Sequence, residues 1–309
     1  LPLKFDAARL LSEVNALDES AWQPHPQGYA GNDAMTLITP HGLNNNDAMS
    51  GPMLPTDYLK ACPYLMQVLR CIGGVWGRTR LMRLSGQAEV TPHIDTNYYW
   101  RERMRVHVPI ITQPSVRFYC ADQDIHMQAG ECWIFDTWSM HNVINDATQA
   151  RIHLVADTVG GEKFWSWFAN SRPAGQNIPG WTAQELASFN EPLAPMRLES
   201  MNVPDVMTPW EMREHFNFLF NEAMPHPALQ DLSALTFELC LAWQALWFEF
   251  GSDAAAYPKY AALRDGYLGK MKAFEFLQLK SGYRLIMAIA QSLMLYSVKD
   301  DLRQTFKEH

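Results

Sequence analysis

The sequence of 309 residues lacks the features of several large protein classes. Its five cysteines are scattered, odd in number and form no C-x-x-C pair, so a disulfide framework is not expected. Basic residues are outnumbered by acidic ones, 25 to 33, and the resulting formal net charge of −8 argues against a nucleic-acid-binding protein. No apolar run reaches the roughly 20 residues that cross a bilayer, and no signal peptide opens the chain. We therefore expect a cytoplasmic protein with neither nucleic acid nor membrane as its partner.

The sequence does contain a β-rich middle part, from about residue 79 to residue 160. Short runs rich in Val, Ile, Phe and Thr predict strands over 104–111, 115–120, 131–136 and 151–158. In the first of these, apolar residues alternate with Arg105 and His107, so the two polar side chains share one face. Several short strands at regular spacing favour a sandwich or barrel over βαβ units.

Helices are predicted on both sides of this β-rich part. The N-terminal ones span about 10–17, behind Asp6 as N-cap, and 56–74, which begins at Thr56 and restarts at Pro63. The C-terminal ones, marked by T-x-x-E capping boxes or strongly apolar segments, span 182–190, 208–224, 229–251 and 281–298. In the third of these, Phe237 and Leu241 are expected in the core. We therefore expect a β domain with N-terminal helices over 1–165 and a helical extension over 166–309.

The stretch "TPHIDT" (91–96) carries the first candidate for chemistry. Side chains alternate across a strand, so His93 and Asp95 emerge on one face, where both are able to bind a single ion. A third ligand has to come from another strand, and His107, His126, His141 and His153 are the candidates. We favour His141, which follows an apolar strand in "FDTWSMHNVIN". Two histidines and a carboxylate form the facial triad that holds non-haem Fe(II).

Arg151 stands ten residues beyond His141, in the predicted strand "RIHLVADT". An arginine inside a barrel is costly unless an anion pairs with it, and its fork suits the distal carboxylate of 2-oxoglutarate. The alternatives are a structural hydrogen-bonded pair at "HID" and a zinc hydrolase. The zinc alternative would leave Arg151 without its anion.

Four segments, "TPHIDT", "RMRVHVPI", "CWIFDTWSMHNVIN" and "RIHLVADT", occur in the order found in a known family. The chain resembles the aspartyl/asparaginyl β-hydroxylases and their bacterial relatives, which include proline cis-4-hydroxylases. The resemblance covers about residues 79–160. It implies a double-stranded β-helix, which is a cupin-like jelly-roll barrel, and a hydroxylase that uses Fe(II), 2-oxoglutarate and O₂.

The resemblance also implies site residues. The metal histidines fall on His93 and His141, and the 2-oxoglutarate arginine falls on Arg151. An R-x-H motif falls on Arg105 and His107, which resemble contacts to substrate and to co-substrate respectively. The animal enzymes of this family lack the metal carboxylate that Asp95 supplies, so the chain is nearer the bacterial amino-acid hydroxylases, and halogenation is not expected.

Further substrate contacts are more open. Arg105 is a candidate for holding a substrate carboxylate, with a structural salt bridge as the alternative. Arg83 and Trp138 are additional candidates. The aromatic run at 98–100 is considered as a lid, while His126 and His153 are interpreted as structural.

Three functions are compatible with these patterns. The leading one is an Fe(II)/2-oxoglutarate hydroxylase acting on a free amino acid or a similar small carboxylated metabolite. The second is a hydroxylase of a peptide or protein residue that uses the helical extension as a binding surface. The third is a non-catalytic cupin-like binding module. The apolar C-terminal helices also suggest a homodimer interface.

Overall fold

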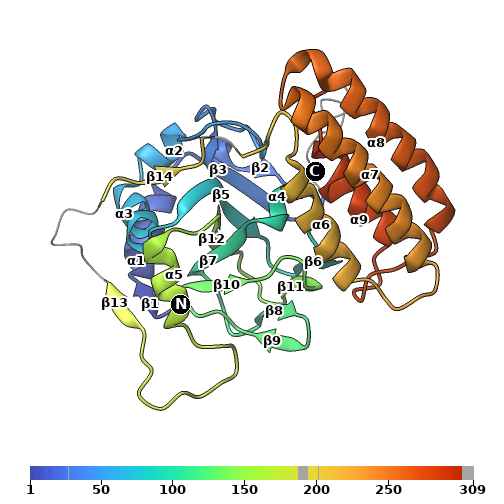
Figure 1. Ribbon diagram of the computed structural model, residues 1–309. Coiled ribbons are helices and arrows are strands. Elements are labelled where there is room, and N and C mark those ends of the chain that lie inside the picture. The colour runs from blue at the N-terminus through green and yellow to red at the C-terminus, as the bar shows by residue number, and fades with distance from the viewer. Residues whose placement is uncertain (27, 187–193, 201, 301–309) are drawn as a thin grey trace. The chain divides into compact units, whose positions relative to one another are not determined.

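The computed structural model describes residues 1–26, 28–186, 194–200 and 202–300. These residues form two compact units (Figure 1). Of the described residues, the first unit contains those within 1–94 and 103–202, and the second contains 95–102 and 203–300. The structure thus divides the chain near residue 202 rather than at the expected residue 165, and it moves one internal segment into the second unit.

Two sheets form the first unit. The larger sheet has the strand order β10-β7-β12-β5-β3-β2, with β14 added to β5 and β4 added to β3. Its strands are β2 (Gln23–Pro24), β3 (Asn32–Pro40), β4 (Met53–Pro55), β5 (Val75–Leu84), β7 (Met104–Ile111), β10 (Trp133–Phe135), β12 (Arg151–Thr158) and β14 (Arg197–Leu198). The smaller sheet, in the order β6-β11-β8-β9, comprises β6 (Ala88–His93), β8 (Val116–Cys120), β9 (Gln123–Ile125) and β11 (His141–Asn145). This architecture confirms the expected jelly roll.

One face of the larger sheet is apolar and packs against helices (Figure 1). Val106, Val108 and Leu154 lie in this core together with residues of α1 (Ala7–Asn15) and α3 (Pro63–Ile72). The expected caps are present at both helical segments. The Asp6 side chain accepts from the amide of Arg9 (3.0 Å), and Thr56 caps α2 (Asp57–Lys60), which precedes α3. The alternation expected for 104–111 is confirmed, because Arg105 and His107 point to the opposite face.

The segment that follows β12 returns to the first unit. It begins with α5 (Glu162–Ala169), and its strand β13 (Gln184–Leu186) pairs in parallel with β1 (Leu3–Phe5). Further on, the buried Glu199 receives two hydrogen bonds of 2.9 Å from the Arg103 guanidinium. The helix expected over 182–190 is therefore wrong at 184–186, and its last four residues lie outside the described ranges. The boundary was misplaced because these short strands depend on distant partners for their stability.

The second unit is helical. It contains α4 (Tyr98–Arg101), α6 (Pro209–Asn221), α7 (Leu229–Phe250), α8 (Tyr257–Met271) and α9 (Leu285–Ser292). Thr208 caps α6 as expected, whereas the helix expected over 281–298 is reduced to α9 and a short 3₁₀ turn. Trp243 is buried, but Phe237 and Leu241 are 63% and 49% exposed, so their expected core position is wrong. None of the helices in the described ranges combines the length and apolar character needed to cross a membrane.

The internal segment 95–102 is held within the helical unit. The Thr96 hydroxyl donates to the Gln291 side chain (3.1 Å), and the Tyr98 hydroxyl donates to Glu211 (2.5 Å). The Tyr98 ring also stacks on Tyr296, with centroids 5.2 Å apart. The aromatic run at 98–100 is almost fully buried, so it forms packing within this unit rather than an exposed lid.

Candidate metal and co-substrate site

Two histidines face each other across the smaller sheet. His93 ends β6 and His141 begins β11, and the two residues are direct antiparallel partners. Directly opposed residues of an antiparallel pair project to the same face of a sheet. Their ring centroids are accordingly 4.3 Å apart.

The two histidines use the same hydrogen-bond pattern to fix their rings. Nδ1 of His93 lies 2.8 Å from the carbonyl oxygen of Thr91, and Nδ1 of His141 lies 2.9 Å from that of Ser139. A carbonyl only accepts, so each Nδ1 carries the hydrogen and each Nε2 carries the lone pair. Metal-binding histidines are oriented and tautomerically fixed in this way by a backbone carbonyl.

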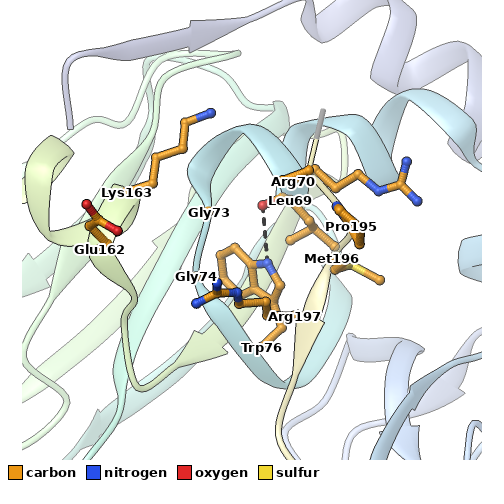
Figure 2. A pocket seen from close by; sticks show the side chains of 11 residues that line it. Leu69, Arg70, Gly73, Gly74, Trp76, Glu162, Lys163, Pro195, Met196 and Arg197 are labelled. Atoms are coloured by element: carbon orange, nitrogen blue, oxygen red, sulfur yellow. Dashed lines mark hydrogen bonds between the residues drawn. The ribbon is translucent and has the colours of Figure 1, made fainter. Parts of the chain in front are cut away.

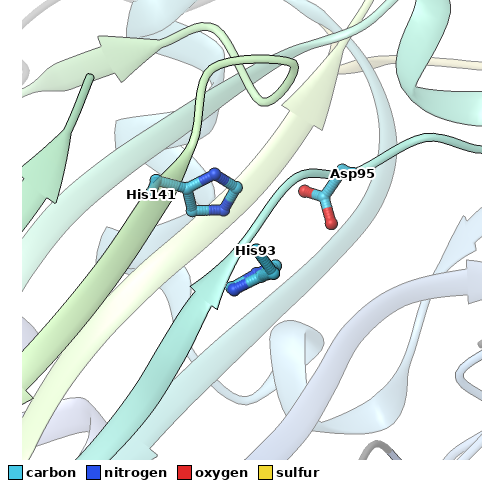
Figure 3. A group of neighbouring side chains, drawn as sticks. All are labelled: His93, Asp95 and His141. Carbon is cyan, nitrogen blue, oxygen red and sulfur yellow. The ribbon is translucent and has the colours of Figure 1, made fainter. Parts of the chain in front are cut away.

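Asp95 completes a triad with these histidines (Figure 3). One ligand atom from each of His93, Asp95 and His141 lies within 4.8 Å of the others. His141 is buried, and the other two side chains are partly exposed, which leaves a route for small molecules. Two imidazoles and one carboxylate are the donor set of non-haem Fe(II) sites with open coordination positions, and these residues fit that ion.

Two phenylalanines pack beside His141 of the triad. The Phe135 ring lies 5.0 Å from that of His141 and 5.3 Å from that of His107. The Phe118 ring packs edge-on against Phe135 at 4.8 Å and lies 5.7 Å from His107. This apolar surround limits the access of water around the metal ligands.

Arg151 lies on the inner face of the larger sheet with 4% of its surface exposed. Among the described residues it forms no ion pair; its Nη2 lies 3.2 Å from Nδ1 of His153, and its buried Nε–H has no protein acceptor. Burial lowers the pKa of its guanidinium to about 10. A buried cation without a carboxylate is the environment in which an anionic ligand binds most favourably.

Two further histidines lie beside Arg151: His107, which was predicted to contact the co-substrate, and His153, which was interpreted as structural. His107 is buried, as expected for a residue near the co-substrate, but His153 is buried as well, with its Nδ1 3.4 Å from Nδ1 of His107. Burial, reinforced by the positive charge of Arg151, lowers the pKa of both rings well below the usual value. Both imidazoles are therefore neutral at pH 7.

A cluster of arginines lies further along the same face. Arg105 donates to Asp157 (3.1 Å), and both Arg78 and Arg80 reach Asp47, at 3.2 and 3.0 Å. These three guanidiniums and two carboxylates together carry one net positive charge. Arg80 was not predicted as a site residue, although "RTR" on β5 places residues 78 and 80 on the same face as the inner residues of β12. The inward position of Asp47 has no signal in the local sequence.

The other two candidates for substrate contact are placed differently. Arg83 is bound to Asp33 (2.9 Å) and Glu19 (2.6 Å), and strand alternation puts it on the face opposite to Arg80. We therefore leave Arg83 out of the substrate site. Trp138 is partly buried in the turn before His141, and its backbone amide donates to the Asp136 side chain (3.0 Å), so Asp136 orients this turn.

A separate pocket of about 160 Å³ opens in the first unit (Figure 2). It is lined by parts of α3, β5, α5 and β14, and no triad residue contributes to it. The Trp76 indole N–H in its wall donates to the carbonyl of Leu69 (3.2 Å). The pocket thus lacks the donor set required for metal chemistry.

Comparisons with known proteins agree with the site. Residues 16–160 match the family model described as Aspartyl/Asparaginyl beta-hydroxylase. An L-proline cis-3-hydroxylase from Streptomyces is 30% identical over 118 residues, which are 36% of this chain and 40% of that protein. The chain therefore matches less than half the length of this relative. The expected kinship with bacterial proline hydroxylases is confirmed, through a cis-3 enzyme.

Solved structures resemble the chain only remotely. An oxidoreductase of the 2OG-Fe(II) oxygenase family from Burkholderia pseudomallei is 13% identical, with a TM-score of 0.38, covering 51% of this chain and 80% of its own. A cupin domain from Bordetella pertussis is 17% identical, with a TM-score of 0.22, covering 26% and 79%. At these scores the likeness adds nothing to the functional argument.

Proposed function

Because residues 16–160 match the model of the aspartyl/asparaginyl β-hydroxylase family, we propose that the protein is an Fe(II)- and 2-oxoglutarate-dependent dioxygenase. Its substrate in this proposal is a free amino acid or a similar small carboxylated metabolite. The observation that carries the proposal is Arg151, a buried guanidinium with no ion-pair partner among the described residues, on the inner face of the same jelly roll as His93 and His141.

His93, Asp95 and His141 would hold the iron, and Arg151 would hold the distal carboxylate of 2-oxoglutarate. When bound, iron and 2-oxoglutarate supply the activation of O₂ and the hydroxylation of a C–H bond, with succinate and CO₂ as the other products. The chain itself fixes the two imidazoles through Thr91 and Ser139, and it keeps water away through Phe118 and Phe135.

The arginine cluster supports the class of substrate. Arg80 is buried, and desolvation lowers the pKa of its guanidinium to about 10 in spite of the neighbouring carboxylates. Arg105 shares its face of the sheet. A guanidinium binds a carboxylate through paired hydrogen bonds, and Arg105 and Arg80 are the residues we propose for the carboxylate of a small substrate.

The test begins with ligand binding. Anaerobic Fe(II) and 2-oxoglutarate should give the weak visible charge-transfer band of the chelate in the wild type, and the band should fade in Arg151→Ala. Arg117→Ala is the matched control, because Arg117 pairs with Asp124 at the surface. No band in the wild type would overturn the proposal.

The second step identifies the substrate. Succinate formation is measured by mass spectrometry with free amino acids, beginning with proline, and with the same residues blocked as N-acetyl amides. Turnover of the free forms alone supports the proposal. Turnover of the blocked forms alone would favour the peptide hydroxylase, and no turnover with stable zinc occupancy would favour a binding module.

A further inference from the structure

Three polar side chains meet on the inner face of the larger sheet. Arg151 and His153 alternate with apolar residues on β12, and His107 comes from the neighbouring strand β7. All three are at most 5% exposed. Nδ1 of His153 is the atom they share, 3.2 Å from Nη2 of Arg151 and 3.4 Å from Nδ1 of His107.

The donors and acceptors in this group follow from the arginine. A guanidinium has only N–H groups, so Nδ1 of His153 must accept, and the hydrogen of this neutral ring lies on Nε2. His107 then needs a hydrogen on its own Nδ1, because two lone pairs would otherwise face each other at 3.4 Å. Its Nε2 consequently carries the lone pair. This proton arrangement lets Nδ1 of His153 accept from both neighbours, and it leaves the buried Nε2–H of His153 without an acceptor among the described residues.

The strand neighbours of His153 offer Arg151 no alternative acceptor side chain. The residue opposite His153 on β5 is Met82, and the residue opposite it on β7 is Pro109. Neither side chain accepts a normal hydrogen bond. His153 is therefore the group that determines where the Arg151 fork points.

We propose that His153 is a positioning residue for the co-substrate: Nδ1 of His153 takes one N–H of Arg151 and so directs the remaining N–H groups toward the distal carboxylate of 2-oxoglutarate. This inference rests on the proposed function. The same hydrogen-bond pattern changes the role of His107, whose Nε2 accepts from a hydroxyl, an ammonium group or water and does not donate to a carboxylate. This proposal gives His153 a role other than the structural one that was expected from the sequence.

The proton arrangement is measurable without metal or turnover. Ring ¹⁵N–¹H correlation spectra of the apoprotein at neutral pH should show the hydrogen of His153 on Nε2 and that of His107 on Nδ1. A hydrogen on Nδ1 of His153 would overturn the proposal, since that atom would no longer be able to accept from Arg151.

Two variants separate positioning from packing. In His153→Asn the amide oxygen takes about the position of Nδ1 and keeps the acceptor, whereas His153→Leu removes it. Titration of the Fe(II)-loaded protein with 2-oxoglutarate is followed anaerobically by the charge-transfer band. The Kd for Leu should rise about tenfold or more, because a misdirected Arg151 fork loses one hydrogen bond to the ligand carboxylate. The Kd for Asn should stay within about threefold of the wild type, and metal affinity should be unchanged in both.

The outcomes distinguish this inference from the proposed function. If the wild type binds 2-oxoglutarate and the Leu variant binds it equally well, the positioning role is refuted while the proposed function stands. If Asn and Leu weaken binding equally, His153 acts through packing alone. If the wild type shows no band, the proposed function itself fails. His226→Leu is the control, because this histidine is exposed in the helical unit. Should the Leu variant not fold, the spectra and the Asn variant still decide.

Discussion

Replacing Arg151 by methionine should stabilise the apoprotein. Burial lowers the pKa of this guanidinium from an ordinary 12.5 to about 10, and each pKa unit corresponds to about 1.4 kcal/mol, so the folded state disfavours the charge by roughly 3 kcal/mol. The guanidinium is charged at pH 7 in both the folded and the unfolded state, and the whole amount is therefore a cost of folding. Loss of its hydrogen bond to His153 offsets about 1.5 kcal/mol. The free energy of unfolding should rise by about 1–2 kcal/mol.

Arg103→Met is the matched comparison, with the opposite expected sign. Arg103 is equally buried but pairs with the buried Glu199, and breaking such a pair costs about 3–5 kcal/mol because it leaves one charge alone. Both variants delete one buried guanidinium and add the same side chain. Only the presence of a protein carboxylate differs between the two sites.

Urea unfolding measures both effects, with and without ligand. With the metal bound to both proteins, 2-oxoglutarate at about 100 times the wild-type Kd should further stabilise the wild type by about 2.7 kcal/mol and Arg151→Met by much less. The order of stability of these two proteins should therefore reverse when the ligand is added. The reasoning is refuted if the apo form of Arg151→Met is less stable than the wild type, or if the ligand stabilises it equally.

Three further predictions concern other parts of the molecule. Asp95→Ala should weaken Co(II) binding by at least tenfold in calorimetry while leaving the fold intact, and unchanged binding would exclude Asp95 as a ligand. Burial and the charge of Arg80 lower the pKa of His25 to about 3. Below about pH 6.5 the unfolded chain therefore takes up a proton at His25 that the folded chain does not, and the free energy of unfolding should fall as the pH drops from 6.5 toward 3. His25→Asn should flatten that slope, and an unchanged slope would contradict this account. Phe237, Leu241 and Phe248 are 63%, 49% and 70% exposed on α7, and a second copy would be able to cover them. Light scattering should show a dimer that Phe237→Glu with Phe248→Glu converts to monomer, whereas a monomeric wild type would contradict the homodimer.

The sequence predicted the jelly roll and the helices best where a local signal was strong. The alternation in 104–111 and the caps at Asp6, Thr56 and Thr208 each involve residues close in sequence, and the structure has them as expected. The strand at 184–186 was missed because a T-x-x-E pattern predicts a helix, while pairing with β1 makes this segment extended. A contact about 180 residues away leaves no mark on the local pattern.

The site was predictable only to the level of residue type and strand position. Side-chain alternation predicted His93 and Asp95 on one face, and His141 was favoured among four histidines. The structure brings these three together, with His93 and His141 paired across β6 and β11 and Asp95 two residues beyond the end of β6. The sequence assigned Arg151 to 2-oxoglutarate, but it did not show that Arg83, a candidate for a substrate contact, is bound by two acidic side chains. The difference between these two arginines depends on which acids lie beside each guanidinium. Asp33 is the partner of Arg83 across β3 and β5, and Glu19 lies in the 3₁₀ turn Glu19–Ala21, so both acids come from segments about 50 and 64 residues away that local periodicity does not pair with Arg83.

The helical unit is discontinuous in the chain, and this has a consequence for its removal. A chain that ends at residue 202 would not be the first unit alone, because it would still contain residues 95–102 of the second unit. The hydroxyl groups of Thr96 and Tyr98 would lose Gln291 and Glu211 as partners, and three aromatic side chains would become exposed. Asp95 is the first residue of that same segment. Any transplant or deletion must therefore treat residues 95–102 and the C-terminal helices as one unit, whose first residue, Asp95, is a proposed metal ligand.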